Sequence, residues 1–96
     1  PASNAVLLLV GRIERATGDF VNAEKHLQQA KRNAVNSSPE IHKELSELYA
    51  NDLKKYGEAA DELESYIKAS KMSGEDEIRT RKIVTGLREK AKKPGE

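Results

Sequence analysis

An internal repeat constrains the fold of this chain more than any other feature of its sequence. Corresponding positions of a repeated pattern align when the sequence is compared with itself at two neighbouring offsets, although Glu14 departs from the aromatic residue that its partner Tyr49 supplies. At an offset of 36, the coinciding pairs are Phe20 and Tyr56, Ala23 and Ala59, and Leu27 and Leu63. At an offset of 35, they are Leu7 and His42, Val10 and Leu45, Gly11 and Ser46, and Glu14 and Tyr49. Because a fixed period indicates a repeated supersecondary unit, the chain is predicted to hold two copies of one unit.

Each copy has the apolar spacing of two helices, since apolar residues recur every three or four positions. Turn residues separate these helices at Thr17-Gly18-Asp19 and again at Asn36-Ser37-Ser38-Pro39-Glu40. The four predicted helices run from a cap at Ser3 or Asn4 to near Ala16, from about Phe20 to Ala34, from Pro39 to about Leu53, and from about Tyr56 to Lys71. The offset changes around Asp52 to Lys55, which predicts a turn one residue longer in the second copy.

A fifth helix is predicted after Met72-Ser73-Gly74, with a cap at Ser73 or Asp76 and an end near Lys92. This helix is expected to be built around the apolar residues Ile78, Ile83, Val84 and Leu87. On the first helix, the apolar residues that recur at this spacing and are expected to form a buried face are Val6, Leu7, Leu9, Val10 and Ile13. Residues 93–96 are expected to be disordered, because a polar terminus with Pro and Gly has nothing to pack against.

These residues resemble the tetratricopeptide repeat (TPR) family, whose unit is a pair of antiparallel helices of about 34 residues. The first copy supplies Leu7-x2-Val10-Gly11, Ala23-x3-Leu27 and Ala30; the second supplies His42-x2-Leu45-Ser46-x2-Tyr49 and Ala59-x3-Leu63. The resemblance covers about residues 4 to 71. It implies an all-α fold, an α-solenoid of antiparallel helix pairs with about five helices in a single domain. Its parts are a first repeat at 4–36, a second repeat at 38–71, a capping helix at 75–92 and the tail at 93–96.

Small residues at matching positions explain how such helix pairs pack. Gly11 or Ser46 on a first helix, and Ala23 or Ala59 on a second, allow the two helix axes to approach closely. The alternative is an ordinary four- or five-helix bundle around one axis, which has the same apolar spacing. Burial of these four positions is therefore expected in the repeat.

The sequence offers no chemistry of its own, and no catalytic, metal-binding or cofactor-binding residues are predicted. It contains no Cys, and its two histidines have no ligand partner at metal-site spacing; His42 is expected at a packing position and His26 in solvent. With 17 basic and 16 acidic residues, the chain has no overall field for nucleic acid, which is not predicted as a partner. The apolar run from Ala5 to Val10 is too short to insert across a membrane. Cytoplasm and periplasm both remain open as locations.

The TPR resemblance implies a protein-interaction scaffold or adaptor that binds a peptide or partner protein in a concave groove formed by the first helix of each unit. The groove residues that the resemblance implies are Leu8, Arg12, Arg15, Lys43, Glu44, Glu47, Arg81, Lys82 and Thr85. Arg12, Lys43 and Arg81 together could receive an acidic or extended peptide, because Arg can hold a carboxylate through two hydrogen bonds.

Two other functions stay open. The chain could be a structural fragment of a longer repeat protein, or a self-associating unit, a homo-oligomer whose N-terminal helix is covered by another copy. An enzyme is the third possibility, which a conserved polar cluster would indicate.

Overall fold

The computed structural model describes residues 3–34 and 38–93, and these residues are all helical or in turns, with no strand. The all-α class predicted from the sequence is thus confirmed for this part of the chain. Residues 36–37 of the predicted loop at Asn36 to Glu40 and residues 94–96 of the predicted disordered tail lie outside the described residues, while Pro39 and Glu40 begin α3. The helices are α1 (Asn4–Ala16), α2 (Phe20–Asn33), α3 (Pro39–Glu47), the π-helical turn η1 (Leu48–Asp52), α4 (Tyr56–Ala69) and α5 (Gly74–Ala91).

Side-chain caps mark the starts of α1 and α2. The Ser3 side chain accepts a hydrogen bond from the Val6 N–H at 3.2 Å at the start of α1. Asp19 accepts from the Asn22 N–H at 3.5 Å at the start of α2, directly after Gly18, whose φ of +88° suits glycine. Ser73 occupies the cap position of α5 without a side-chain hydrogen bond.

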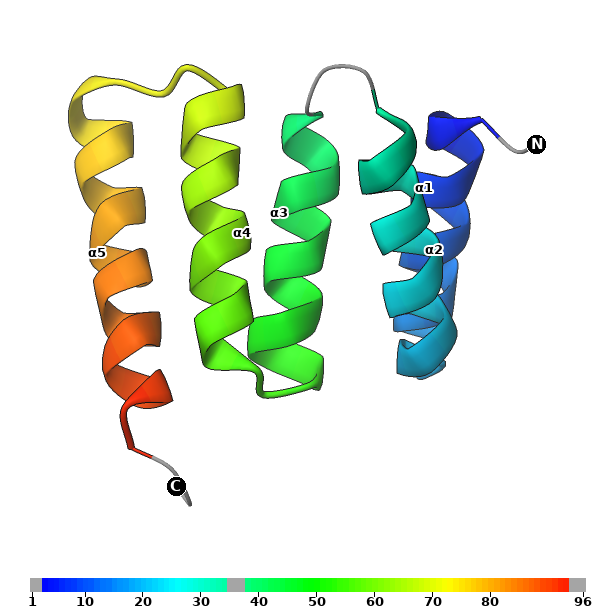
Figure 1. The fold of residues 1–96 in the computed structure, drawn as a ribbon. Helices are drawn as coiled ribbons and strands as arrows, with labels where there is room; N and C mark the ends of the chain where they lie inside the picture. The colour runs from blue at the N-terminus through cyan, green and yellow to red at the C-terminus, as the bar shows by residue number, and fades with distance from the viewer. Residues whose placement is uncertain (1–2, 35–37, 94–96) are drawn as a thin grey trace.

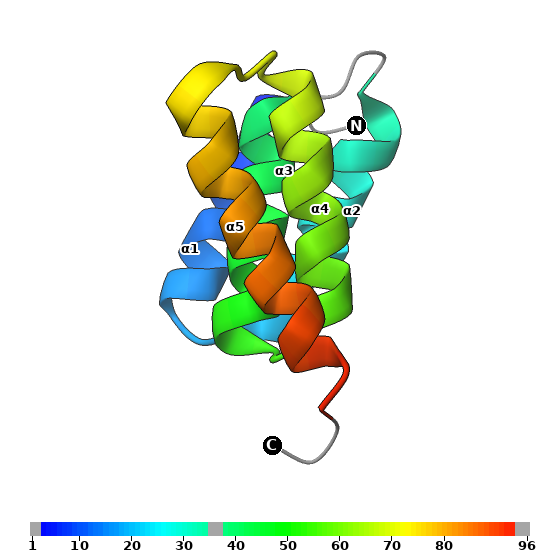
Figure 2. The same cartoon turned by 90° about the vertical axis from the view of Figure 1, so that its left-hand side faces the viewer.

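The helices lie side by side in the order of the sequence, and each connection reverses the direction of the chain (Figure 1). α1 packs on α2, α3 on α4, and α4 on α5. Seen from the α5 end, α5 crosses in front of α3 and α4, with α1 and α2 behind them on opposite sides (Figure 2). One apolar core runs through these contacts, and its largest fully buried side chains are Leu27, Ile41, Leu45 and Leu48.

The two predicted small-residue positions on α1 and α3 are both buried. A Cβ atom at Gly11 would lie 2.6 Å from Leu27 Cγ, so the absence of a side chain is what admits Leu27. Ser46 instead donates a hydrogen bond to the Ala59 carbonyl oxygen at 3.1 Å. Ala23 and Ala59 are fully buried as expected, although the nearest neighbour of Gly11 is Leu27, one turn beyond Ala23.

The sequence predicts the extra residue of the second copy in the turn around Asp52 to Lys55. In the structure it lies in the end of the preceding helix, in η1. In the first copy the Thr17 N–H donates to the Ile13 carbonyl, four residues earlier, at 3.0 Å. In the second copy the Leu53 N–H donates to the Leu48 carbonyl, five residues earlier, at 2.9 Å. This wider turn is η1, and a π turn of this kind accommodates one added residue inside a helix.

The apolar stripe predicted on α1 faces two ways. Leu7 and Leu8 are buried, but Val6, Leu9 and Ile13 are about half exposed, at 49%, 56% and 54%. The prediction that all the apolar residues of α1 belong to the core was therefore wrong for these three. Packing on α2 covers only one side of α1, and no described element covers the other.

The prediction for the core side of α5 was also wrong at two positions. Val84 and Leu87 are buried, whereas Ile78 and Ile83 are exposed at 58% and 57%. Only the α4 side of α5 is covered, because α5 packs along α4 and has little contact with α3.

Candidate interaction site

Four of the predicted groove residues form an ion-pair cluster between α1 and α3. Arg12 Nε lies 3.0 Å from Glu44 Oε1, and Arg15 Nη1 lies 3.0 Å from Glu44 Oε2 and 3.3 Å from Glu47 Oε1. Arg15 also pairs with Asp52 in η1. Burial alone would lower the pKa of Arg15, but its bonds to Asp52 and Glu44 more than offset this, so the pKa is raised. The cluster joins the first helix pair to the second.

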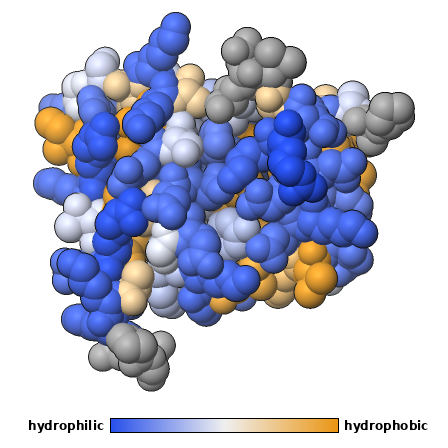
Figure 3. All heavy atoms as spheres, viewed as in Figure 1, coloured by the Kyte–Doolittle hydropathy of each residue, from blue (hydrophilic) through white to orange (hydrophobic). Residues whose placement is uncertain are grey.

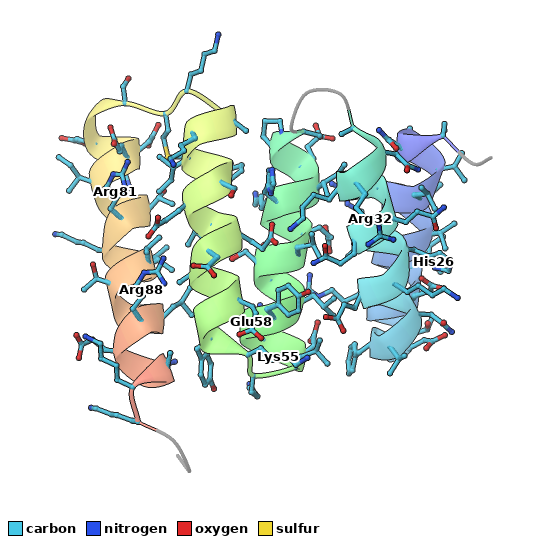
Figure 4. The ribbon with its side chains drawn as sticks, viewed as in Figure 1. His26, Arg32, Lys55, Glu58, Arg81 and Arg88 are labelled. Carbon is cyan, nitrogen blue, oxygen red and sulfur yellow. The ribbon has the colours of Figure 1, made fainter. Side chains whose placement is uncertain are left out.

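Lys43 lines a hollow of about 480 Å³ together with Arg12, Glu44 and Glu47, but the remaining predicted groove residues lie elsewhere. Leu8 is buried in the core. Arg81, on the outer part of α5 (Figure 4), pairs with Glu77 of the same helix at 2.8 Å. Lys82 and Thr85 are exposed on α5, and the Thr85 hydroxyl donates to the Arg81 carbonyl at 3.1 Å. The structure therefore does not bring the nine predicted residues onto one surface, and their role in binding stays a prediction.

A cleft of about 580 Å³ opens between α3 and α5. This volume falls in the range of sites that bind ligands or side chains of a partner. Its apolar lining comes from four elements: Ala50 of η1, Tyr56, Leu63 and Tyr66 of α4, Met72 of the following turn, and Ile83 and Leu87 of α5. Of the predicted groove residues, Lys43 and Glu47 line it. Most of the surface in Figure 3 is hydrophilic, with apolar side chains visible beside α5 on the left.

One helical stripe of α5 faces this cleft, and the sequence did not identify it. The stripe consists of Asp76, Arg79, Thr80, Ile83, Leu87 and Lys90. These residues recur at three- and four-residue spacing, so they share one side of the helix. The groove residues predicted on α5, which are Arg81, Lys82 and Thr85, lie on a different side of the helix. The half-exposed Ile83 was assigned to the core because apolar spacing does not distinguish a packed face from an open one.

The charged groups of the cleft are unequally paired. Glu47 pairs with Arg15, and Asp76 pairs with Arg79. In the described part of the chain, no carboxylate lies within ion-pair distance of Lys43 or Lys90. Lys90 Nζ lies 5.4 Å from the centre of the Tyr56 ring, which is a cation–π contact. Neither lysine therefore forms an ion pair with a described side chain.

A buried polar network, which the sequence analysis missed, crosses three helices. Glu62 Oε2 of α4 lies 2.6 Å from Lys31 Nζ of α2, and Glu62 Oε1 lies 2.9 Å from His42 Nδ1 of α3. His42 is buried as expected, and Glu62 is buried with it. His26 is partly buried and lies 2.7 Å from Glu14, which corrects the expectation that it is solvated. Nothing in the spacing indicates such pairs, because they join separate helices.

Tyr49 of η1 forms a further contact between the helix pairs. Its hydroxyl donates to Glu24 at 2.8 Å and accepts from Gln28 at 2.8 Å, both on α2. Burial, followed by the hydrogen bond to Glu24, raises the pKa of Tyr49 from 10.0 to about 12. The phenol is therefore held neutral and fixed at the junction.

Comparison of the chain with family models, with curated proteins and with solved structures found no match in any of the three. In the described residues, no helix combines the length and the apolar character needed to cross a membrane. The same residues contain no group of three or more His, Asp or Glu side chains placed to hold a metal ion.

Proposed function

We propose that this chain is a non-catalytic scaffold that binds a partner protein or peptide in the cleft between α3 and α5. On this proposal its architecture is a TPR-like solenoid, with repeats at 4–36 and 38–71 and a capping helix at 75–92. The sequence repeat supports this, as do the burial of Gly11 and Ser46 and the chain-order packing of the helices.

The open apolar cleft is the observation that carries the proposal. Leu63 and Tyr66 form its floor on α4, and the side chain of Ile83 is 57% exposed at its wall. An exposed apolar concavity rimmed by charged residues is typical of protein interaction sites. Helix-in-groove recognition needs such a channel between two helices.

The proposal revises which residues contact the partner. Arg12 and Arg15 hold α1 against α3, so we assign them to the scaffold. Lys43 and Glu47 remain as predicted contacts, because they line the cleft. The stripe of α5 that contains Ile83 replaces Arg81, Lys82 and Thr85.

Selection from a display library of random 15-residue peptides tests this function. We expect binders whose amide chemical-shift perturbations on the labelled chain centre on Leu63, Tyr66 and Ile83. Ile83→Asp should abolish their binding. Ile78→Asp is the matched control, because Ile78 is on the same helix and equally exposed but does not line the cleft. A library that yields no binder, or binders insensitive to Ile83→Asp, would contradict the proposal.

Self-association is the second candidate, and the exposed face of α1 favours it. Val6, Leu9 and Ile13 form an apolar stripe that no described element covers. Sedimentation over a range of concentrations distinguishes the candidates: a concentration-dependent oligomer that Leu9→Asp dissociates would support self-association. A monomer at all concentrations would remove it.

A further inference from the structure

The cleft between α3 and α5 combines an apolar floor with two lysines, Lys43 and Lys90, that form no ion pair with a described side chain. Its wall on α5 runs from Asp76 to Lys90, which is 14 residues apart, or about 21 Å along a helix. Lys43 is the first residue of α3 that lines the cleft, Lys90 is the last residue of α5 that does so, and the two helices run in the same direction (Figure 1). The two lysines are therefore separated along the length of the cleft.

The carboxylates of the cleft form ion pairs with arginines and not with these lysines. Glu47 and Asp76 each have an arginine as their partner, Arg15 and Arg79. Lys43 is exposed, and Lys90 has only the Tyr56 ring as a close partner. A ligand that brings carboxylates to these positions gains two ion pairs without displacing an existing one.

The shape of the cleft favours a helix as the ligand. Its walls are two helices, α3 and α5, that lie on the same side of α4 and have little contact with each other. The lining of α5 follows helical spacing, so its ridges can interlock with those of a helix lying alongside. A cleft about 21 Å long accommodates about four helical turns.

We propose, on the basis of the proposed function, that the partner segment is an acidic amphipathic helix whose apolar face contacts Leu63, Tyr66 and Ile83 and whose acidic residues reach Lys43 and Lys90. A second copy of α1 fits less well. The polar side of α1 carries Arg12 and Arg15, and both are already paired with α3. Nucleic acid offers charge but no apolar side chains for the floor.

Three designed 18-residue peptides test the charge requirement. They share one apolar helix face, and they carry Glu, Gln or Lys on its flanks. Fluorescence anisotropy should give the Glu peptide an affinity about tenfold higher than the Gln peptide, with the Lys peptide weakest, since each exposed ion pair contributes several-fold. The advantage of the Glu peptide should shrink as the salt concentration rises, and its helical circular dichroism should increase on binding.

Paired lysine variants locate the effect. Lys43→Gln with Lys90→Gln should reduce affinity for the Glu peptide to that for the Gln peptide, while binding of the Gln peptide is unchanged. Lys68→Gln with Lys82→Gln is the control, because these two exposed lysines do not line the cleft. If the three peptides bind equally, the acidic partner is wrong but the cleft remains a binding site. If none of the three designed peptides binds although library peptides bind the cleft, the acidic helix is also the wrong partner. If the library itself yields no peptide that binds the cleft, the proposed function is wrong.

Discussion

The two helix pairs share a fully buried alanine, Ala23 and Ala59, but differ at the small residue through which the first helix of each pair packs on the second. In the first pair, Gly11 has no side chain and Leu27 fills the space above it. In the second, Ser46 retains a side chain and bonds to the Ala59 carbonyl. The second pair also contains the π turn and borders the open cleft. The first pair thus packs mainly through the contact of α1 with α2. The second pair also contacts α2 on one side and α5 on the other.

Truncating Leu27 and Leu63, which occupy the same position in the two pairs, should give the largest change in the free energy of unfolding. It tests whether the two pairs differ in stability as well as in geometry. Leu27 is completely buried, whereas Leu63 is 9% exposed and borders the cleft. We expect Leu27→Ala to lower the free energy of unfolding by about 4 kcal/mol and Leu63→Ala by about 2 kcal/mol, because water can enter the space beside Leu63. Urea denaturation measures both. Equal losses would mean that the two leucines are equivalent in the core.

Alkaline pH tests the junction between the pairs, where Tyr49 occupies the position of Glu14 in the first pair. Its pKa is about 12 in the folded chain and 10.0 when unfolded, so the unfolded chain loses the phenol proton first. The stabilisation is fully present below pH 10 and is lost as the pH rises towards 12, by about 2 kcal/mol. Urea denaturation at pH 8 to 12 should show this fall, and Tyr49→Phe should remove the contribution. A fall of the same size in Tyr49→Phe would contradict the assignment.

Exchanging glycine for alanine separates close packing from helix propensity. A methyl group at Gly11 would lie 2.6 Å from Leu27 Cγ, and the fully buried Leu27 has no free space in which to move. We expect Gly11→Ala to lower the melting temperature, with a net loss of about 1 kcal/mol after the helix-propensity gain of alanine. Gly86 is the control, because a Cβ there meets nothing within 4 Å. Gly86→Ala should instead stabilise the chain by about 0.5 to 1 kcal/mol. Two stabilising substitutions would show that α1 and α2 are not in close contact.

Much of the fold could be predicted because its signals are local. The start of α1 follows from Ser3, and the start of α2 from Gly18 and Asp19, all within one turn of the helices that they cap. The repeat also identified the small positions at Gly11 and Ser46. The offset change revealed one extra residue, but a longer turn and a wider helix end give the same spacing, so its location needed coordinates.

The candidate site was predicted less well because it depends on how whole helices are turned. Ile78 and Ile83 have the same side chain and suit the same helix, yet only Ile83 lines the cleft. The rotation of α5 depends on contacts with other helices: Val84 and Leu87 are buried, and Arg88 (Figure 4) pairs with Asp61 and Glu64 of α4, 24 or more residues earlier in the chain. Contacts over such separations leave no trace in local periodicity.

The smallest expected change in stability comes from the turns inside the two pairs. Gly18 in the first turn and Lys54 in the second both have a left-handed backbone conformation. Gly18 has φ of +88° and Lys54 has φ of +56°. A side chain at positive φ is strained, so Lys54→Gly should raise the free energy of unfolding by about 0.5 to 1 kcal/mol, even after the added freedom of the unfolded chain. Gly18→Lys should lower it by about as much, because no neighbour within 4 Å adds a steric effect. Lys54→Ala keeps the strain and should change little, so a stabilisation equal to that of Lys54→Gly would place its origin in the lysine charge and not in the backbone.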